Sequence, residues 1–490
     1  MQIRTLSALS AIGMLLTSYS VWSLTERNGA PDAAAAVPRE AEERPRRPTL
    51  AGADTAAFVA DGTLRTEARL GHARLAAGSE TETFVLVNVR ADDKVVGRSA
   101  SRHLAIVIDR SGSMSGKRLT NALAAAEAAV RKLSTGDRVS VIDYASSARL
   151  LVPVTELDAS SRERVIEQIR NVTAGGDTCI SCALDATLQT LGRFSGVVDR
   201  VLLVSDGEAT AGIRDVDGMR RVAEGVRNAG ASVTTIGVDV DYNERMLAAI
   251  AEVTNGRHYF VESPEGLARI FDRELSGLER TVAREARLEL EPAPGVEIVE
   301  VLDRSFVRRG SRVLVSLGSF SAGEERGVLA RVRIASGKPG SRPVASARLD
   351  YADLASGKQA SNEGQLVATL TDDGSRSALD PMVEERVQRT GTVTALNEAN
   401  GLFQAGDFEG AKKRVDGKLD EVRSRRSQAV AAAPAARRPA IEREFAKQEA
   451  ALGNAASAFA EPPKGGSAAE VSRGKAASKR NQAAASDLAF

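Results

Sequence analysis

The sequence predicts an α/β chain built on a doubly wound, mostly parallel, Rossmann-like sheet, with a flanking β-sandwich and a C-terminal helical hairpin. Two short apolar runs, Leu104–Ile108 and Val201–Val204, are typical of strands buried on both faces of a sheet. Strand-like and helix-like segments alternate between residues 100 and 275, as in sheets whose helices cover both faces. Segments of period two between 284 and 370 predict antiparallel strands, and helical spacing returns at 379–426.

Composition limits the classes of function. The chain has 490 residues, enough for about three domains, and 43% of them are hydrophobic. Its 66 basic and 65 acidic side chains leave a net charge of +1, so no overall field attracts a nucleic acid, and we expect no nucleic-acid partner. Only three histidines are present, which leaves little room for histidine-based catalysis or a zinc site.

The first 60 residues predict export from the cytoplasm. Residues 1–27 have a basic residue and then an uncharged, largely apolar stretch, which is typical of a signal peptide or of a retained membrane anchor, and both alternatives stay open. Residues 28–60 are rich in Ala, Pro, Glu and Arg and predict a disordered linker. We therefore expect an extracytoplasmic protein of the periplasm or cell envelope, membrane-anchored or, if the signal is cleaved, secreted.

The elements that follow predict an inserted domain. Residues 61–98 and 284–370 both carry strand signals, and neither segment has enough strands for a stable sheet with a buried face, so we expect them to form one sandwich. The α/β domain, 99–280, would then lie between strands of that sandwich. Its expected strands and helices are 104–108, 117–133, 138–144, 150–154, 160–171, 179–191, 201–204, 216–229, 232–238, 243–253, 258–261 and 264–278.

The C-terminal part predicts helices and then disorder. Apolar residues at helical spacing indicate a hairpin at 379–426, interrupted by Gly406 and Asp407. Residues 427–490 are dominated by Ala, Ser, Arg and Lys, with few large apolar side chains, so we expect a mostly disordered, Ala-rich tail.

Polar residues follow the ends of the two most apolar strands. Asp109, Ser111 and Ser113 come directly after the first strand, and Asp206 comes after the second. Since ligands of open parallel sheets bind at the carboxyl ends of strands, these side chains should lie close together. Between them in the sequence, two glycines precede Thr178. Hydroxyls with few carboxylates suit Mg²⁺, Mn²⁺ or Ca²⁺ rather than Zn²⁺.

Residues 100–280 resemble a von Willebrand factor type A domain with a metal-ion-dependent adhesion site, as in bacterial cell-envelope proteins. The family's Asp-x-Ser-x-Ser motif is intact at Asp109, and Thr178 and Asp206 correspond to its later ligands, although Asp177 intervenes between the glycines and Thr178. The resemblance implies that the hydroxyls of Ser111, Ser113 and Thr178 bind the ion directly or through water, and that the carboxylates act largely through water. An open coordination position then accepts a carboxylate from a partner protein.

The implied function is divalent-cation-dependent adhesion or assembly, without catalysis. Two other classes stay open: an envelope scaffold whose metal site does not function, and a metal-assisted hydrolase. Against catalysis, Gly112–Arg118 lacks the spacing of a phosphate loop, and no base is indicated beside Ser111. Cys179 and Cys182 predict either a local disulfide of an oxidising compartment or two packed thiols.

Overall fold

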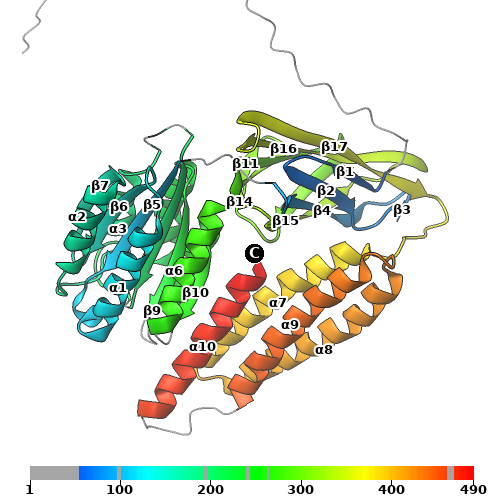
Figure 1. Ribbon diagram of the computed structural model, residues 1–490. Helices are drawn as coiled ribbons and strands as arrows, with labels where there is room; N and C mark the ends of the chain where they lie inside the picture. The colour runs from blue at the N-terminus through cyan, green and yellow to red at the C-terminus, as the bar shows by residue number, and fades with distance from the viewer. Residues whose placement is uncertain are drawn as a thin grey trace, which may run out of the picture. The chain divides into compact units, whose positions relative to one another are not determined.

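The computed structural model describes residues 55–95, 101–192, 194, 196–206, 208–238, 243–261, 264–460 and 468–489 (Figure 1). They belong to the unit Pro48–Phe490, and the other unit, Met1–Arg47, is outside them. The expected signal peptide or anchor and most of the expected linker therefore lie outside the described residues. Within these ranges, no helix has both the length and the apolar character needed to cross a membrane.

A six-stranded sheet forms the α/β domain, in the order β10-β9-β8-β5-β6-β7. Neighbouring strands are parallel except at one edge, where β7 runs antiparallel to β6. This confirms the predicted doubly wound, mostly parallel sheet. The strands are β5 (Arg102–Asp109), β6 (Arg138–Tyr144), β7 (Ala148–Glu156), β8 (Val198–Ser205), β9 (Ser232–Val238) and β10 (His258–Val261).

Helices cover both faces of this sheet, because alternate residues of a strand point to opposite sides. In β5, Ile106 packs with α1 (Lys117–Lys132), α2 (Ala159–Arg170) and α6 (Pro264–Glu279). The next residue, Val107, packs in a second core with the helices of the other face. Those helices are α3 (Ile180–Leu188), α4 (Val216–Asn228) and α5 (Glu244–Val253). The middle of such a central strand must be apolar on both faces, as Leu104–Ile108 of β5 is.

The predicted β-sandwich has two sheets, ordered β1-β2-β4-β15-β12 and β13-β14-β11-β16-β17-β3, which share one apolar core. Each sheet combines strands from before and after the α/β domain, so the domain is inserted as expected. The first strand, β1, lies inside the segment predicted as a linker. The strands are β1 (Ala57–Ala60), β2 (Leu64–Leu70), β3 (Arg74–Ala76), β4 (Thr81–Ala91), β11 (Thr281–Pro292), β12 (Val296–Val301), β13 (Val307–Arg309), β14 (Arg312–Ser321), β15 (Glu325–Ile334), β16 (Gly340–Asp353) and β17 (Lys358–Thr371).

The C-terminal region is helical, and the prediction of a disordered tail at 427–490 is wrong for its described residues. Helices α7 (Pro381–Gln404) and α8 (Phe408–Ala432) form the predicted hairpin, and α9 (Arg438–Ala460) and α10 (Ala468–Ala489) follow. Large apolar residues recur at helical spacing in α9 (Ile441, Phe445, Leu452 and Phe459), and together with Leu488 of α10 they share a core with α7 and α8. Alanine has the highest helix propensity, so this composition supports helices once such a face is buried.

Candidate metal centre

Asp109 anchors the centre at the carboxyl end of β5. Its side chain is fully buried. One carboxylate oxygen, Oδ1, accepts a hydrogen bond from the backbone N–H of Ser111 at 2.8 Å, and Oδ2 accepts one from the hydroxyl of Ser205 at 2.7 Å. The carboxylate is thus held between the loop after β5 and the end of the neighbouring strand β8.

The two serines of the motif connect Asp109 to Asp206. The hydroxyls of Ser111 and Ser113 are 3.0 Å apart, and the Ser113 hydroxyl donates to Asp206 Oδ1 at 2.8 Å. Asp206 is fully buried, whereas Ser113 is exposed. The structure therefore brings four of the five predicted side chains into one hydrogen-bonded cluster that reaches solvent at Ser113.

The loop that carries Thr178 is fastened to the same edge of the sheet by backbone hydrogen bonds. The Gly112 N–H donates to the Gly176 carbonyl oxygen at 2.9 Å, and the Gly175 N–H donates to the Arg110 carbonyl oxygen at 2.7 Å. Gly176 has φ +88°, a conformation that favours glycine. Thr178 is buried, and its N–H donates to the Thr210 hydroxyl at 2.9 Å. The paired glycines thus set the position of the loop relative to the serine motif.

The electrostatics of the cluster fit a bound cation. Burial raises the pKa of Asp109, against the effect of hydrogen bonds from Ser111 and Ser205. Burial likewise raises the pKa of Asp206, opposed by Ser113 and Arg118. The charge of Asp206 also raises the pKa of Asp109, so the two buried carboxylates interact, and a cation between them would offset both charges. The two hydroxyls and two carboxylates of the cluster, together with the hydroxyl of Thr178 on the adjoining loop, are oxygen donors that suit Mg²⁺, Mn²⁺ or Ca²⁺. In the described part of the chain, no group of three or more His, Cys, Asp or Glu side chains forms a site.

Three polar residues of the centre were missed in the sequence analysis. Arg118 of α1 donates through Nη1 to Asp206 Oδ2 at 2.9 Å and to the Ser113 carbonyl oxygen at 3.0 Å. Ser205 holds Asp109, and its position directly before Asp206 at the end of a buried strand could have indicated this. Thr210 holds the backbone of Thr178. Only Ser205 had a signal in the sequence, because the contacts of the other two depend on tertiary packing.

Two neighbouring features shape the loops. Asp143 at the end of β6 is fully buried, and its carboxylate contacts the guanidinium groups of Arg110 and Arg149. The salt bridge between Asp143 and Arg110 therefore holds the loop that follows β5. Cys179 and Cys182 form a disulfide at the start of α3, directly after Thr178. The Cys179 N–H also donates to the Ala145 carbonyl oxygen at 2.8 Å, which ties this turn to the end of β6.

Residues 103–273 match the family model of the von Willebrand factor type A domain, and the chain therefore contains such a domain. The uncharacterized protein YfbK of Escherichia coli (strain K12) is 27% identical over 220 residues, which is 44% of this chain and 38% of that protein. The uncharacterized protein sll0103 of Synechocystis sp. is 25% identical over 348 residues, 68% of this chain and 81% of that protein.

A solved structure extends the similarity in fold beyond this domain. The von Willebrand factor type A protein from Catenulispora acidiphila has a TM-score of 0.64 and 19% sequence identity, covering 74% of this chain and 88% of that chain. The shared fold therefore includes more than residues 103–273, and at this identity the comparison speaks for the fold alone.

Proposed function

We propose that the chain binds a protein partner through a divalent cation, and that Asp109, Ser111, Ser113, Thr178 and Asp206 hold this ion. The observation that carries the proposal is the cluster itself. Side chains from two separate strand ends hydrogen-bond to one another around two fully buried carboxylates, whose pKa values are raised by burial. Mg²⁺ is the expected ion, with Mn²⁺ or Ca²⁺ as alternatives from the same donor set.

The exposure of the cluster supports an open coordination position. Asp109, Ser111 and Asp206 are buried, whereas Gly112 and Ser113 are exposed. An ion held by the hydroxyls would be reached by solvent or by a ligand from the Ser113 side. Hard cations prefer oxygen ligands, so a carboxylate from a partner protein suits this position.

Binding rather than catalysis suits the surroundings of the serines. In the part of the chain that the structure describes, the hydroxyls of Ser111 and Ser113 hydrogen-bond to each other, and Ser113 donates to Asp206, an arrangement that suits hydroxyl ligands. A serine nucleophile requires an adjacent base. The buried histidine of the same strand, His103, lies at the opposite end of β5 and contacts Asp199 and Ser140. Turnover of a substrate that disappears in Asp109→Ala would overturn this part of the proposal.

An extracytoplasmic location is supported by the Cys179–Cys182 disulfide, because disulfides persist in oxidising compartments. The charged start and apolar stretch of residues 1–27 support the same location. We propose that the domain meets its partner in the periplasm or cell envelope.

Calorimetric titration with Mg²⁺ and Mn²⁺ tests the metal centre. Thr178→Ala and Ser113→Ala should each weaken binding by about 10-fold or more, since each removes a hydroxyl ligand. Ser115→Ala is the matched control, because Ser115 is an exposed serine two residues beyond the motif. Wild-type affinity in both ligand variants contradicts the assignment, and a wild-type protein that binds neither ion favours the scaffold alternative.

Partner binding is tested separately, with envelope extract passed over immobilised protein. A partner should be retained with Mg²⁺ and released by chelator, and Thr178→Ala protein should not retain it. Retention that is equal with and without the metal would contradict a metal-bridged contact.

A further inference from the structure

A cavity of about 430 Å³ lies between the α/β domain and the outer face of one sheet of the sandwich. The α/β domain contributes the ends of α4 and α5 and the start of β9, and the sandwich contributes β11, β13 and β14. A hydrogen bond of 3.0 Å from the Asn255 side chain to the Ser316 carbonyl oxygen joins the two walls. The cavity thus lies at the edge where β9 begins, whereas the metal centre lies where the parallel strands end.

Three arginines line the cavity, namely Arg227 of α4, Arg287 of β11 and Arg309 of β13. None of the three forms a salt bridge or a side-chain hydrogen bond within the described part of the chain, and the Nε atom of Arg227 is buried. The carboxylate of the lining, Glu285, pairs with Arg284 outside it. The neighbouring acids of the sheet face also pair with arginines outside the cavity, Glu289 with Arg312 and Asp350 with Arg348. The lining therefore carries an excess of positive charge.

An apolar wall lies beside these charges. Phe306 and Val307 are 37% and 48% exposed, and they are two of the six large hydrophobic side chains that the described part of the chain exposes. Leu314 of β14 lies directly opposite Val307 in the sheet and continues the wall. Single exposed apolar side chains are common on proteins, but adjacent ones that line a cavity indicate a surface that a ligand covers.

The backbone of the sandwich wall is distorted where it lines the cavity. Glu285 has φ +56°, a conformation that is uncommon for residues other than glycine, and the other such residue of the described chain, Asn255, also lines the cavity. The pairing register of β11 shifts on both sides just before Arg287. Because a β-bulge changes the direction in which the next side chains leave the sheet, this distortion sets the direction of Arg287. Bulges and strained residues of this kind are frequent beside binding sites.

We propose that this cavity binds a small organic anion, in which an apolar or aromatic body carries a carboxylate or a phosphate. Guanidinium groups bind both oxyanions through charge-assisted, often paired hydrogen bonds. The arginines of the lining would contact the anionic end, and the body would pack against Phe306, Val307 and Leu314. The volume suits such a ligand, because small-molecule sites measure about 300–1,000 Å³.

The test is calorimetric titration of the whole protein with phenylacetate, with phenyl phosphate and with the uncharged phenylacetamide, at constant ionic strength set with chloride. Chelator is present throughout, so that no anion binds through a cation at the metal centre. We expect saturable binding of at least one of the two anions with a Kd of about 5 mM or tighter, and the tighter one identifies the carboxylate or the phosphate as the preferred group. The amide should bind at least about fivefold more weakly, because it carries no charge for the arginines to pair with.

Variants then locate the site. Arg287→Met should weaken binding of the tighter anion by about fivefold or more, because it removes a charge-assisted hydrogen bond. Phe306→Ser, which removes part of the apolar wall, should weaken it as well. Both side chains are exposed, so both variants should fold. Arg221→Met, an exposed arginine of α4 outside the lining, is the control and should bind as the wild type does.

Three results would overturn the proposal. The first is the absence of saturable binding of either anion up to about 20 mM. The second is binding of the amide as tight as that of the anions. The third is wild-type affinity in Arg287→Met or in Phe306→Ser.

Discussion

Replacing Arg118 by methionine should tighten metal binding. The Arg118 guanidinium lies where it competes for the same carboxylate as the ion, because Nη1 donates to Asp206 Oδ2 at 2.9 Å. It also donates to the Ser113 carbonyl oxygen, so it spans two residues of the proposed ligand set. A cation that binds to Asp206 must weaken this contact and is repelled by the guanidinium charge. Both effects act against the metal.

The size of the effect follows from the burial of the pair. A hydrogen bond to a charged group contributes about 1.5–3 kcal/mol, whereas exposed ion pairs contribute about 0–1 kcal/mol. The Asp206 side chain is fully buried but that of Arg118 is 31% exposed, which places the pair between these limits. We take about 1 kcal/mol, which corresponds to about fivefold tighter binding of Mg²⁺ or Mn²⁺ in Arg118→Met.

The assay is calorimetric titration of wild type, Arg118→Met and Arg131→Met. Arg131 is an exposed arginine on the same helix that pairs with Glu127, so its replacement controls for loss of charge on α1. Arg118 lowers the pKa of Asp206, so its removal favours protonation, and titration at about pH 8 keeps that carboxyl ionised. Equal or weaker affinity in Arg118→Met than in wild type would refute the competition.

Three further outcomes follow. Gly256→Ala should lower the free energy of unfolding by more than about 2 kcal/mol, since a Cβ there would lie 1.9 Å from a backbone carbonyl oxygen of β9. The control Gly417→Ala in α8, where a Cβ would meet nothing within 4 Å, should not lower it, and similar urea midpoints for the two variants would contradict the prediction. Burial alone would raise the pKa of Glu324, but the charge of Arg326 and the backbone N–H of Ser321 lower it from 4.5 to about 2. Wild type should therefore lose stability relative to Glu324→Gln as the pH falls from 4.5 to 2, and parallel acid-unfolding curves would contradict this. Reduction of the disulfide should change Mg²⁺ affinity by about two- to threefold, a small effect because Cys179 adjoins only one proposed hydroxyl ligand. Equal affinity in oxidised, reduced and Cys179→Ser/Cys182→Ser protein would contradict this and leave the bond a purely structural feature.

The parts of the fold and site that the sequence predicts are those fixed by the main chain. An apolar run flanked by polar residues identifies a central strand, and the end of that strand locates Asp109. Because β5 and β8 are hydrogen-bonded neighbours, the residue after β8 must lie beside the end of β5. Asp206 follows from this register, without any knowledge of side-chain rotamers.

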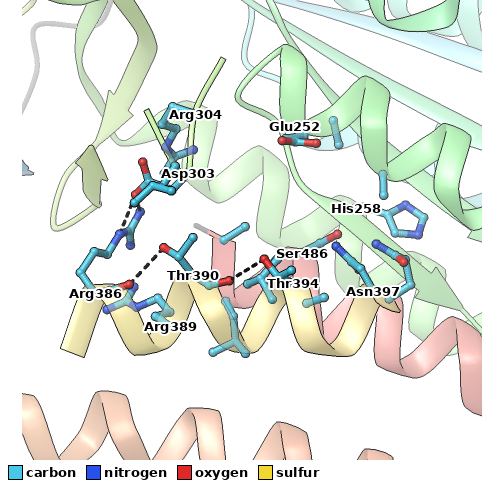
Figure 2. Close-up of a pocket in the computed structure, with 18 of the residues that line it drawn as sticks. Glu252, His258, Asp303, Arg304, Arg386, Arg389, Thr390, Thr394, Asn397 and Ser486 are labelled. Carbon is cyan, nitrogen blue, oxygen red and sulfur yellow. Dashed lines mark hydrogen bonds and ion pairs between the residues drawn. The ribbon is translucent and has the colours of Figure 1, made fainter. Parts of the chain in front are cut away.

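Other features depend on contacts that no local pattern records. Arg118 reaches Asp206 from a helix, and the direction of a long flexible side chain depends on its neighbours in space. Arg386 of α7 likewise pairs with Asp303, a residue 83 positions away in the sequence (Figure 2). Helices α9 and α10 were missed because the segment is rich in Ala, Ser, Arg and Lys, which suggests disorder. A few spaced apolar residues such as Phe445 and Phe459 are nevertheless enough to bury one face of a helix.

The insertion of the α/β domain places its connections to the sandwich at the end of β5 opposite the proposed metal centre. Arg102, the first residue of β5, forms a salt bridge of 3.6 Å with Glu279, the last residue of α6, so the two ends of the domain meet at one edge of the sheet. Both connections to the sandwich start there. Asp109 lies at the other end of β5, about 23 Å away at the rise per residue of a strand. A partner that contributes a carboxylate to the proposed ion would therefore approach the edge opposite the covalent connections. Because the domain is joined to the sandwich by two connections, its orientation is more restricted than a single linker would make it.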